Sequence, residues 1–288
     1  MIITKLNGGL GNQMFQYAAG KRLAIKNNTE LKIDNTEYQA NNYRAYGLNN
    51  FNIIENIATQ SEIAKIKKSG FLKIIDSFKP NYKRSTVRHH KYNFYPNLLK
   101  IKDHTYLDGN WQNEKYFLDI KEGIIKDFTL KNPIDNKYPN LISQIKNTNS
   151  VSLHIRRGDY ITNKKFSKVY SLLDEKYYKR AVKFIAEKIS DPRFFIFSDD
   201  IKWVKQNLNI SYPKIFVSDE NETKNYEELI LMSLCKHNII ANSSFSWWGA
   251  WLNQNPDKTV VVPKNWFKIQ SCNEKYELPK TWCILENN

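Results

Sequence analysis

The sequence has few cysteines and no long apolar run, and both shortages narrow its class. Cys235, Cys272 and Cys283 occur without a C-x-x-C spacing, which excludes a disulfide framework and a zinc knuckle. No apolar run approaches the roughly 18 residues that a helix needs to cross a bilayer. The apolar start at residues 2–6 runs directly into Asn and Gly, so it is too short for a signal peptide. We therefore expect a globular, reduced protein of the cytoplasm.

Metal-binding patterns are missing as well. There is no Asp-x-Asp triplet, and no group of His and carboxylate residues has the spacing of metal ligands. His89 and His90 form an isolated pair in a basic stretch, which is typical of a solvated surface. We expect no metal and no cofactor, so cationic side chains would have to neutralise any bound anion.

Arginine is scarce although the chain is strongly basic. The 288 residues include 44 Lys and Arg against 29 Asp and Glu, a net charge of +15, but only eight of the 44 are Arg. Arg binds phosphates and base edges through paired hydrogen bonds, so a Lys-rich chain more often has a solvated surface than a nucleic-acid footprint. Nucleic-acid binding is therefore a remote alternative.

The positive charge is concentrated in residues 61–102, which hold eleven Lys and Arg and two acidic residues. Two interpretations fit this stretch. It makes peripheral contact with an anionic membrane surface, or it is a solvated face.

Short apolar runs alternate with amphipathic stretches, which predicts an α/β protein with largely parallel strands. A polar stretch near 135–150 separates two halves. We expect an N-terminal, acceptor-binding domain over residues 1–145 and a C-terminal, donor-binding domain over 146–288, with the last residues packing back on the first. Because ligands bind at the carboxyl ends of parallel strands, two such sheets facing each other would form a cleft.

Hydrophobic periodicity gives the individual elements. In the first half we expect strands at 2–6, 31–34 and 105–108 and helices at 13–26, 61–68, 113–128 and 138–147. In the second half we expect strands at 151–155, 194–197, 214–217, 238–241 and 259–262 and helices at 175–189, 201–208, 223–235 and 246–253. Five strands alternating with four helices indicate a doubly wound domain.

The loop at residues 7–13 (Asn-Gly-Gly-Leu-Gly-Asn-Gln) lies between an expected strand and an expected helix. Its glycines allow close backbone approach, and a helix N-terminus offers N–H groups to an anion. Met14 stands where a dinucleotide fingerprint needs Gly or Ala, and no Gly-Lys-Ser/Thr of a P-loop follows. The loop is either an anion- or sugar-binding element or an ordinary glycine turn.

The loop at residues 154–160 (His-Ile-Arg-Arg-Gly-Asp-Tyr) ends the first strand of the second half. Strand alternation sends His154 and Arg156 to one face and Arg157 to the other. Two adjacent guanidinium groups are costly to bury unless anions meet them. Either Asp159 pairs with one arginine and leaves the other for a ligand, or the group is a structural ion-pair cluster.

Two further strand ends carry polar residues. Residues 198–200 (Ser-Asp-Asp) follow the second strand and are expected to cap the next helix. Residues 242–246 (Asn-Ser-Ser-Phe-Ser) lead into a helix whose hydroxyl and N–H groups form a good phosphate seat. Trp247, Trp248 and Trp251 have helical spacing, which favours core packing over a sugar-stacking platform.

Together, residues 8–18, 154–160, 197–200 and 242–249 resemble the motif set of the α-1,2-fucosyltransferases, glycosyltransferase family 11. The motifs span nearly the whole chain, and the four together are highly specific. Residues 111–117 (Trp-Gln-Asn-Glu-Lys-Tyr-Phe) also resemble a family segment of the first domain. Animal members carry a membrane anchor before the catalytic domain. This sequence contains no apolar run of that length, so we expect it to be of the bacterial type.

The resemblance implies an α/β fold of the GT-B class, with two Rossmann-like domains facing across a cleft. It implies transfer of L-fucose from GDP-β-L-fucose to the 2-hydroxyl of a terminal galactose, with inversion and without a metal, in surface polysaccharide or O-antigen synthesis. The partners would be GDP-fucose and a β-galactoside glycan, free or lipid-linked, with no nucleic acid. A glycosyltransferase that uses another GDP-sugar is the alternative.

The resemblance also assigns roles to residues. His154 would contact guanine or ribose, Arg156 the β-phosphate, and Asp219 would bind guanine. The whole donor site would comprise Gly9, Gly11, Asn12, His154, Arg156, Arg157, Ser198, Asp199, Asp219, Ser243, Ser244 and Phe245. The acceptor site would include Trp111, Gln112 and Glu114.

Catalysis would use charge stabilisation and a base. Arg156 and the helix N-terminus at 243–246 would stabilise the negative charge that the leaving GDP gains. A single displacement also needs a base on the acceptor hydroxyl. We expect Asp159 to be this base, with Asp199 and Glu114 as alternatives.

Overall fold

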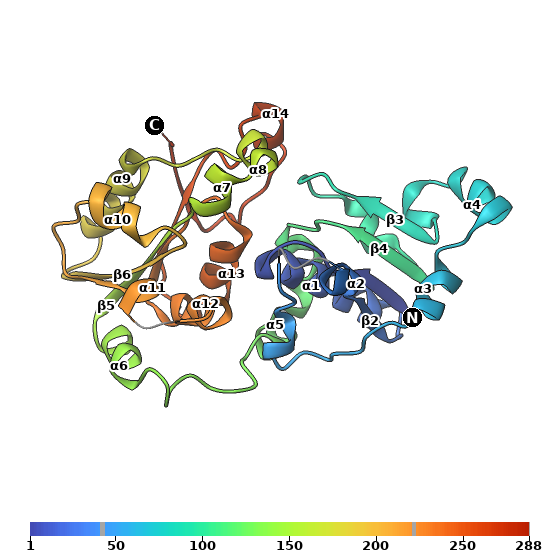
Figure 1. Cartoon of the computed structure of the whole chain (residues 1–288), viewed down its shortest axis with the longest axis horizontal. Helices are drawn as coiled ribbons and strands as arrows, with labels where there is room; N and C mark the ends of the chain where they lie inside the picture. The colour runs from blue at the N-terminus through green and yellow to red at the C-terminus, as the bar shows by residue number, and fades with distance from the viewer. Residues whose placement is uncertain (41–43, 221–222, 288) are drawn as a thin grey trace. The chain divides into compact units, whose positions relative to one another are not determined.

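Two α/β units make up the chain (Figure 1). The first unit comprises Met1–Asn132 and Lys275–Glu277, and the second comprises Pro133–Glu274 and Leu278–Asn288. The computed structural model describes residues 1–40, 44–220 and 223–287, without the side chains of residues 40, 219 and 220.

A parallel sheet of four strands, in the order β2-β1-β4-β3, forms the centre of the first unit. The strands are β1 (Ile2–Lys5), β2 (Leu31–Asp34), β3 (Thr86–His89) and β4 (Thr105–Gly109). The three expected strands are confirmed, and β3 is an addition that the sequence pattern does not reveal. β3 lies at the edge of the sheet and buries one residue, Val87, so it lacks the apolar signal of the other strands.

The α-helices of the first unit differ from the expected set in three places. They are α1 (Leu10–Lys26), α2 (Thr36–Ala40), α3 (Gln60–Ile66), α4 (Gly70–Ser77) and α5 (Lys121–Asp127), with short 3₁₀ helices η1 (Leu48–Asn50), η2 (Asn81–Lys83), η3 (Pro96–Lys100), η4 (Glu114–Tyr116) and η5 (Leu118–Ile120). The helix expected over 113–128 is wrong, because the buried Phe117 has a non-helical φ of −143° and divides the segment into η4, η5 and α5. The short helix α2 and the apolar helix α4 are also absent from the expected set.

The second unit contains a parallel sheet of six strands in the order β10-β9-β8-β5-β6-β7. The strands are β5 (Asn149–Ile155), β6 (Pro192–Ser198), β7 (Lys214–Phe216), β8 (His237–Ile239), β9 (Val260–Pro263) and β10 (Cys283–Leu285). The five expected strands are confirmed, and β10 extends the sheet beside β9. Counted from β5, the order is that of a doubly wound fold, whose topological switch lies between β5 and β8.

Helices connect these strands as parallel pairing requires. They are α6 (Pro139–Asn147), α7 (Gly158–Thr162), α8 (Lys164–Val169), α9 (Glu175–Ala186), α10 (Ile201–Asn207), α11 (Val217–Glu220), α12 (Asn225–Leu234), α13 (Ser244–Leu252) and α14 (Gln270–Asn273). The four expected helices of this half correspond to α9, α10, α12 and α13.

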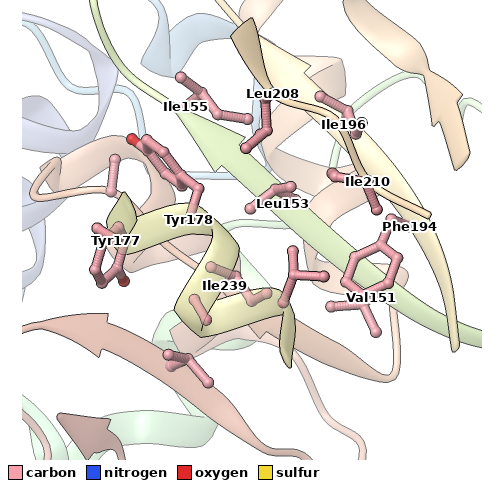
Figure 2. Packing of buried hydrophobic residues seen from close by; sticks show 14 of the residues in the cluster. Val151, Leu153, Ile155, Tyr177, Tyr178, Phe194, Ile196, Leu208, Ile210 and Ile239 are labelled. Carbon is pink, nitrogen blue, oxygen red and sulfur yellow. The ribbon is translucent and has the colours of Figure 1, made fainter. Parts of the chain in front are cut away.

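The core of the second unit forms where α9 packs on the sheet (Figure 2). α9 contributes Tyr177 and Tyr178, and β5 contributes Val151, Leu153 and Ile155. All residues of β5 after the first are buried. This packing fixes the end of β5, from which the loop at 156–160 starts.

The units divide between Asn132 and Pro133, earlier than the boundary expected after residue 145. The reason is that α6 is amphipathic and buries Leu141, Ile142 and Ile145, packing against β5 and α12 of the second unit. Near the chain end, Lys275–Glu277 groups with the first unit, and the last segment returns to the second unit as β10.

Both units are α/β and contain only parallel strand pairs among the described residues. The expected class, GT-B with two Rossmann-like units, is confirmed. Within the described ranges, no helix is both long enough and apolar enough to span a membrane.

Candidate functional site

The expected site residues fall into two groups, one in each unit. The group in the second unit is His154, Arg156, Arg157, Asp159, Ser198, Asp199, Asp219, Ser243, Ser244 and Phe245. The group in the first unit is Gly9, Gly11, Asn12, Trp111, Gln112 and Glu114.

In the second unit, the loops that follow β5 and β8 meet at the topological switch. The Tyr160 hydroxyl donates to the backbone carbonyl oxygen of Asn242 at 2.7 Å. The ring centroids of His154 and Phe245 lie 5.5 Å apart. The carboxyl ends of strands at a switch point are where open α/β sheets bind ligands, so the two loops form the candidate donor site.

The Arg156 guanidinium lies between two carboxylates. Its Nη2 donates to Oδ1 of Asp159 at 2.7 Å, and its Nη1 lies 3.0 Å from Oδ2 of Asp199. Burial disfavours the cation, but the carboxylates of Asp199 and Asp159 outweigh burial and raise the pKa of the guanidinium. Arg156 is therefore a permanent cation whose planar fork is held in one orientation.

Arg157 makes a separate set of contacts. Its guanidinium carbon lies 3.7 Å from the centroid of the Trp203 ring, and its Nε lies 3.4 Å from Oδ2 of Asp200. Its backbone N–H donates to Oδ1 of Asp199 at 2.9 Å. Both arginines therefore have carboxylate partners, whereas one alternative open from the sequence left one of them without such a partner.

The cluster contains two arginines and three aspartates, so it is not a purely cationic pocket. Asp159, Asp199 and Asp200 together outnumber Arg156 and Arg157. A diphosphate at this position has to share or replace a carboxylate partner of Arg156, because an uncompensated buried charge is costly.

His154 is a buried, neutral imidazole. Burial, together with the nearby Arg156 cation, lowers its pKa to about 3. Within the described residues, its Nδ1 has no hydrogen-bond partner. His154 therefore contributes hydrogen-bonding capacity next to Arg156 and no positive charge at neutral pH.

α13 begins at this site with a hydroxyl cap. Oγ of Ser243 accepts from the backbone N–H of Phe245 at 3.3 Å. The Asn242 side-chain amide donates to two backbone carbonyl oxygens, each at 2.7 Å, which fixes the turn. Ser244 and Phe245 are half-buried and lie in the first turn of α13.

The tryptophans of α13 are core residues, as their spacing predicts. Trp247, Trp248 and Trp251 are all buried. The ring of Trp248 packs edge to face against each of the other two at 5.1 Å, and Trp247 and Trp251 stack at 6.0 Å. They fix the start of α13 and do not form an exposed sugar platform.

The polar residues after β6 divide their roles. Asp200 caps α10 by accepting from the Trp203 N–H at 3.2 Å, so the expected helix cap is confirmed. Oγ of Ser198 accepts from the Asp200 N–H at 3.0 Å. Asp199 instead contacts both arginines.

Glu228 joins this site although no sequence motif includes it. The Ser198 N–H donates to Oγ of Ser218 at 3.0 Å, Ser218 hydrogen-bonds Glu228, and the Thr223 hydroxyl donates to Glu228 at 2.8 Å. Burial, reinforced by the Asp199 carboxylate, raises the pKa of Glu228. Its position at the start of α12 hides this role, because acidic residues are ordinary there.

Asp219, the expected guanine-binding residue, lies in α11. Its side chain falls outside the part of the chain that the structure describes.

In the first unit, the loops after β1 and β4 meet in the same way, since these strands are neighbours in the sheet. Nε2 of Gln112 donates to Oδ1 of Asn12 at 2.9 Å, which joins an expected donor residue to an expected acceptor residue. Gln16, which is not among the expected site residues, donates to the carbonyl oxygen of Gly109 at 3.2 Å. Gly9 is the N-cap of α1 and offers no side-chain cap, and Gly11 lies in its first turn.

The acceptor candidates differ in exposure. Trp111 is buried, has a positive φ of 53°, and stacks at 5.7 Å on the ring of His89. Its ring therefore packs inside the first unit, against His89, and holds the loop after β4 in place. Gln112 is buried against Asn12, whereas Glu114 is partly exposed at the start of η4.

Among the described residues, no group of three or more His, Cys, Asp or Glu side chains could hold a metal ion. The aspartates around Arg156 are engaged by guanidinium groups instead.

Comparison with known proteins agrees with these motifs. The sequence model of glycosyl transferase family 11 matches residues 1–286. The chain is 36% identical to an alpha-1,2-colitosyltransferase of Escherichia coli over 99% of each chain. It is 34% identical to the O-antigen biosynthesis glycosyltransferase WbnK of Escherichia coli, over 91% of this chain and 93% of that one. A mutant of Arabidopsis thaliana FUT1 in complex with GDP matches with a TM-score of 0.51 and 9% identity, over 90% of this chain and 69% of that one, a likeness of fold alone.

Proposed function

The chain belongs to glycosyl transferase family 11, and from this membership we propose that it is a galactoside α-1,2-fucosyltransferase. Its general activity, glycosyl transfer, follows from the family. The proposed donor is GDP-β-L-fucose, and the proposed acceptor is the 2-hydroxyl of a terminal β-galactose in a free or lipid-linked glycan. The similarity to WbnK supports a role in O-antigen or related surface polysaccharide synthesis.

The observation that carries the proposal is the fixed cation at the switch of the second sheet. Arg156 is held by Asp159 and Asp199. Its neighbours in the same loop contact the start of α13, Tyr160 through Asn242 and His154 through Phe245. A planar guanidinium and a helix N-terminus are both suited to a diphosphate. The motif resemblance and the α-1,2 linkage in the name of the colitosyltransferase support the same reaction type.

The proposed reaction is a single displacement. The acceptor oxygen forms a bond to C1 of fucose while the bond from C1 to the β-phosphate oxygen breaks. The electron pair of that bond leaves with GDP, and the proton of the acceptor hydroxyl passes to a base. Arg156 and the N–H groups of α13 stabilise the charge that develops on the leaving phosphate.

We assign the base to Asp159. It is the carboxylate within the motif loop itself, three residues after Arg156, and its Oδ1 is hydrogen-bonded to Nη2 of that arginine. A carboxylate that shares a hydrogen bond with the phosphate-binding arginine couples leaving-group stabilisation to proton removal. Asp199 and Glu114 remain the alternative bases.

Guanine recognition is assigned to His154 and Asp219, with Glu228 as a further candidate. The N1 and exocyclic N2 groups of guanine are both donors, and a carboxylate accepts from them as a pair. Glu228 lies beside the loop of Ser198, and burial raises its pKa. Hydrogen bonds from the guanine N–H groups would favour the ionised form of its carboxylate.

The acceptor is assigned to the loop of the first unit that contains Trp111, Gln112 and Glu114, with Asn12 of the expected donor set beside it. Amide side chains such as that of Gln112 both donate and accept, which suits the hydroxyl groups of a sugar. The bond between Gln112 and Asn12 fixes the orientation of both amides.

One observation favours a second candidate function. The similarity to a colitosyltransferase makes transfer of colitose a specific alternative. Colitose is L-fucose without its 3-hydroxyl, so the two donors differ by one hydrogen-bonding group, and a site built to bind that hydroxyl would discriminate strongly. Other GDP-sugars such as GDP-mannose are the wider alternative.

The test is a donor and acceptor matrix with the purified full chain. GDP-fucose, GDP-colitose and GDP-mannose are each offered with β1,3- and β1,4-linked galactosides and with free lactose, and GDP release is measured. We expect turnover with GDP-fucose and a product whose NMR spectrum shows an α-1,2 linkage. A 2-deoxygalactoside is the matched control and should give no transfer. A kcat/KM that is higher for GDP-colitose or GDP-mannose would overturn the fucose assignment.

A further inference from the structure

Helix α4 exposes its apolar side chains and buries a charged one, which is the reverse of an ordinary surface helix. It exposes Phe71, Leu72, Ile74 and Ile75, and Phe78 follows directly, with the side chains of Phe71 and Phe78 exposed by 73% and 85%. We call these five residues the α4 patch. In the described part of the chain, the other large exposed apolar residues occur singly along the sequence or, at Ile54 and Ile57, as a pair. Isolated exposed apolar residues are normal for a protein surface, whereas a contiguous group marks an interaction site.

The buried residue of α4 is its aspartate. Asp76 is 6% exposed and accepts from the backbone N–H and the hydroxyl of Ser85, at 2.8 and 2.9 Å. Nζ of Lys79 donates to it at 3.0 Å. Although burial opposes ionisation, these bonds lower the pKa of Asp76 to about 2, so it is ionised at neutral pH.

A second anchor holds the end of α4. Arg84 donates to the backbone carbonyl oxygens of Ser77 and Lys79, at 2.7 and 2.9 Å. Asp76 and Arg84 together fix the helix in the orientation that presents its apolar side outward, beside β3 at the edge of the first unit (Figure 1). The exposure of the α4 patch is therefore built into the fold.

The charge around the α4 patch has one sign. Residues 61–102 contain eleven Lys and Arg and two acidic residues, and both acids are neutralised, Asp76 by its buried bonds and Glu62 by an ion pair with Lys32. Lys73 is exposed within α4 and Lys83 is exposed after it, while the exposed Lys79 is the ion-pair partner of Asp76. An apolar group next to exposed lysines is complementary to a surface that is apolar inside and anionic outside.

We propose that the α4 patch and its flanking lysines bind the surface of a bilayer that contains anionic lipid headgroups. Phe71 and Phe78 insert at the boundary of headgroups and acyl chains, and the lysines remain at the level of the phosphates. This inference goes beyond the proposed function, since it requires neither the donor nor the acceptor. It would bring the enzyme to lipid-linked acceptors if the proposed acceptor class is correct.

The test is sedimentation of the full chain with vesicles. Phosphatidylcholine vesicles with about one third phosphatidylglycerol are compared with pure phosphatidylcholine vesicles, at low and high salt. We expect binding to the anionic vesicles that weakens as salt rises, and little binding to the neutral ones. Equal binding to both, or no binding to either, would overturn the proposal.

Matched variants locate the contact. Phe71→Ser/Phe78→Ser should lower the partition coefficient at least about tenfold, because apolar insertion and charge act together. Ile269→Ser/Ile284→Ser removes two equally apolar side chains, each 55% exposed, from the second unit and should change nothing. Unchanged binding of the phenylalanine variant would overturn the assignment to α4.

Two further measurements separate membrane binding from misfolding and from self-association. Phe78→Ser alone, at the most exposed position, repeats the test if the double variant does not fold. Light scattering without vesicles detects a dimer of this chain through the α4 patch, which Phe71→Ser/Phe78→Ser would convert to monomer, and that result without vesicle binding would overturn the proposal. Transfer to a soluble galactoside should be the same in the phenylalanine variant and the wild type, so failure of membrane binding and failure of the proposed function are distinguishable.

Discussion

Gly158 lies so close to Asp199 that a Cβ atom on residue 158 would be 2.6 Å from Oδ2 of the aspartate and 3.1 Å from its Cγ. The same Oδ2 atom lies 3.0 Å from Nη1 of Arg156. A residue with a Cβ atom at position 158 would therefore clash with Asp199. The glycine leaves room for the Asp199 carboxylate, which follows β6, to reach Arg156, which follows β5.

Gly158→Ala should displace Asp199 and release one side of the Arg156 guanidinium. We expect kcat/KM to fall at least about tenfold, because a small misplacement of a positioning group is costly in catalysis. Gly123→Ala is the matched control, since the nearest atom to its Cβ would be Nζ of Lys21 at 3.8 Å, and it should leave activity unchanged. Steady-state kinetics of both variants check this, and equal activity would contradict the role given to Gly158.

Arg156→Ala should lower kcat by at least about 10², as does loss of one preorganised charge donor. Arg156→Lys should also lose most of the activity, because an ammonium cannot bridge two carboxylates and a phosphate as a planar fork does. Arg180→Ala is the control, since Arg180 bonds an exposed backbone carbonyl of Glu286. An Arg156→Ala enzyme with normal kcat would refute the assigned role.

Asp159→Asn separates catalysis from binding. If Asp159 is the base, turnover should fall by about 10² to 10⁴. The affinity for GDP, measured by calorimetry, should be unchanged or higher, because one negative charge beside the diphosphate is removed. Retained turnover would move the base to Asp199 or Glu114, and Glu114→Gln is then the next variant.

The buried His154 predicts a pH dependence of stability. Its pKa is about 3 in the folded protein, against about 6.5 for an unfolded histidine, so the unfolded state takes up a proton first as pH falls. The stability that depends on a neutral His154 is therefore fully present above about pH 6.5. As pH falls from there toward about 3, the free energy of unfolding decreases by about 1.4 kcal/mol per pH unit. Urea unfolding of wild type and His154→Gln between these limits measures it. The variant should have the shallower pH dependence, and identical slopes would contradict the burial of a neutral imidazole.

Chelation tests the proposed independence of metal. We expect the rate with GDP-fucose to be the same with and without excess EDTA, because Arg156 and α13 are assigned the charge stabilisation that a divalent ion supplies elsewhere. A rate that EDTA abolishes and Mg²⁺ or Mn²⁺ restores would overturn this assignment.

Much of the fold is predictable because its signals are local. The strand at 151–155 and the helix at 175–189 follow from apolar periodicity, and α9 begins at Glu175 and buries Ala181, Val182 and Ile185. Edge elements carry weaker signals, so β3 and β10 go undetected. α4 also goes undetected, because its apolar side chains face outward and its aspartate is buried.

The family, the α/β class and the loops that carry the chemistry follow from the sequence alone, since each depends on residues close together in the chain. How the charges combine depends on the tertiary structure. The register of β5 and β6 places Ile155 beside Ser198, so the next residues, Arg156 and Asp199, meet although they are far apart in the chain. Pairing of this kind depends on which strand ends are neighbours in the sheet, and local sequence patterns do not encode that arrangement.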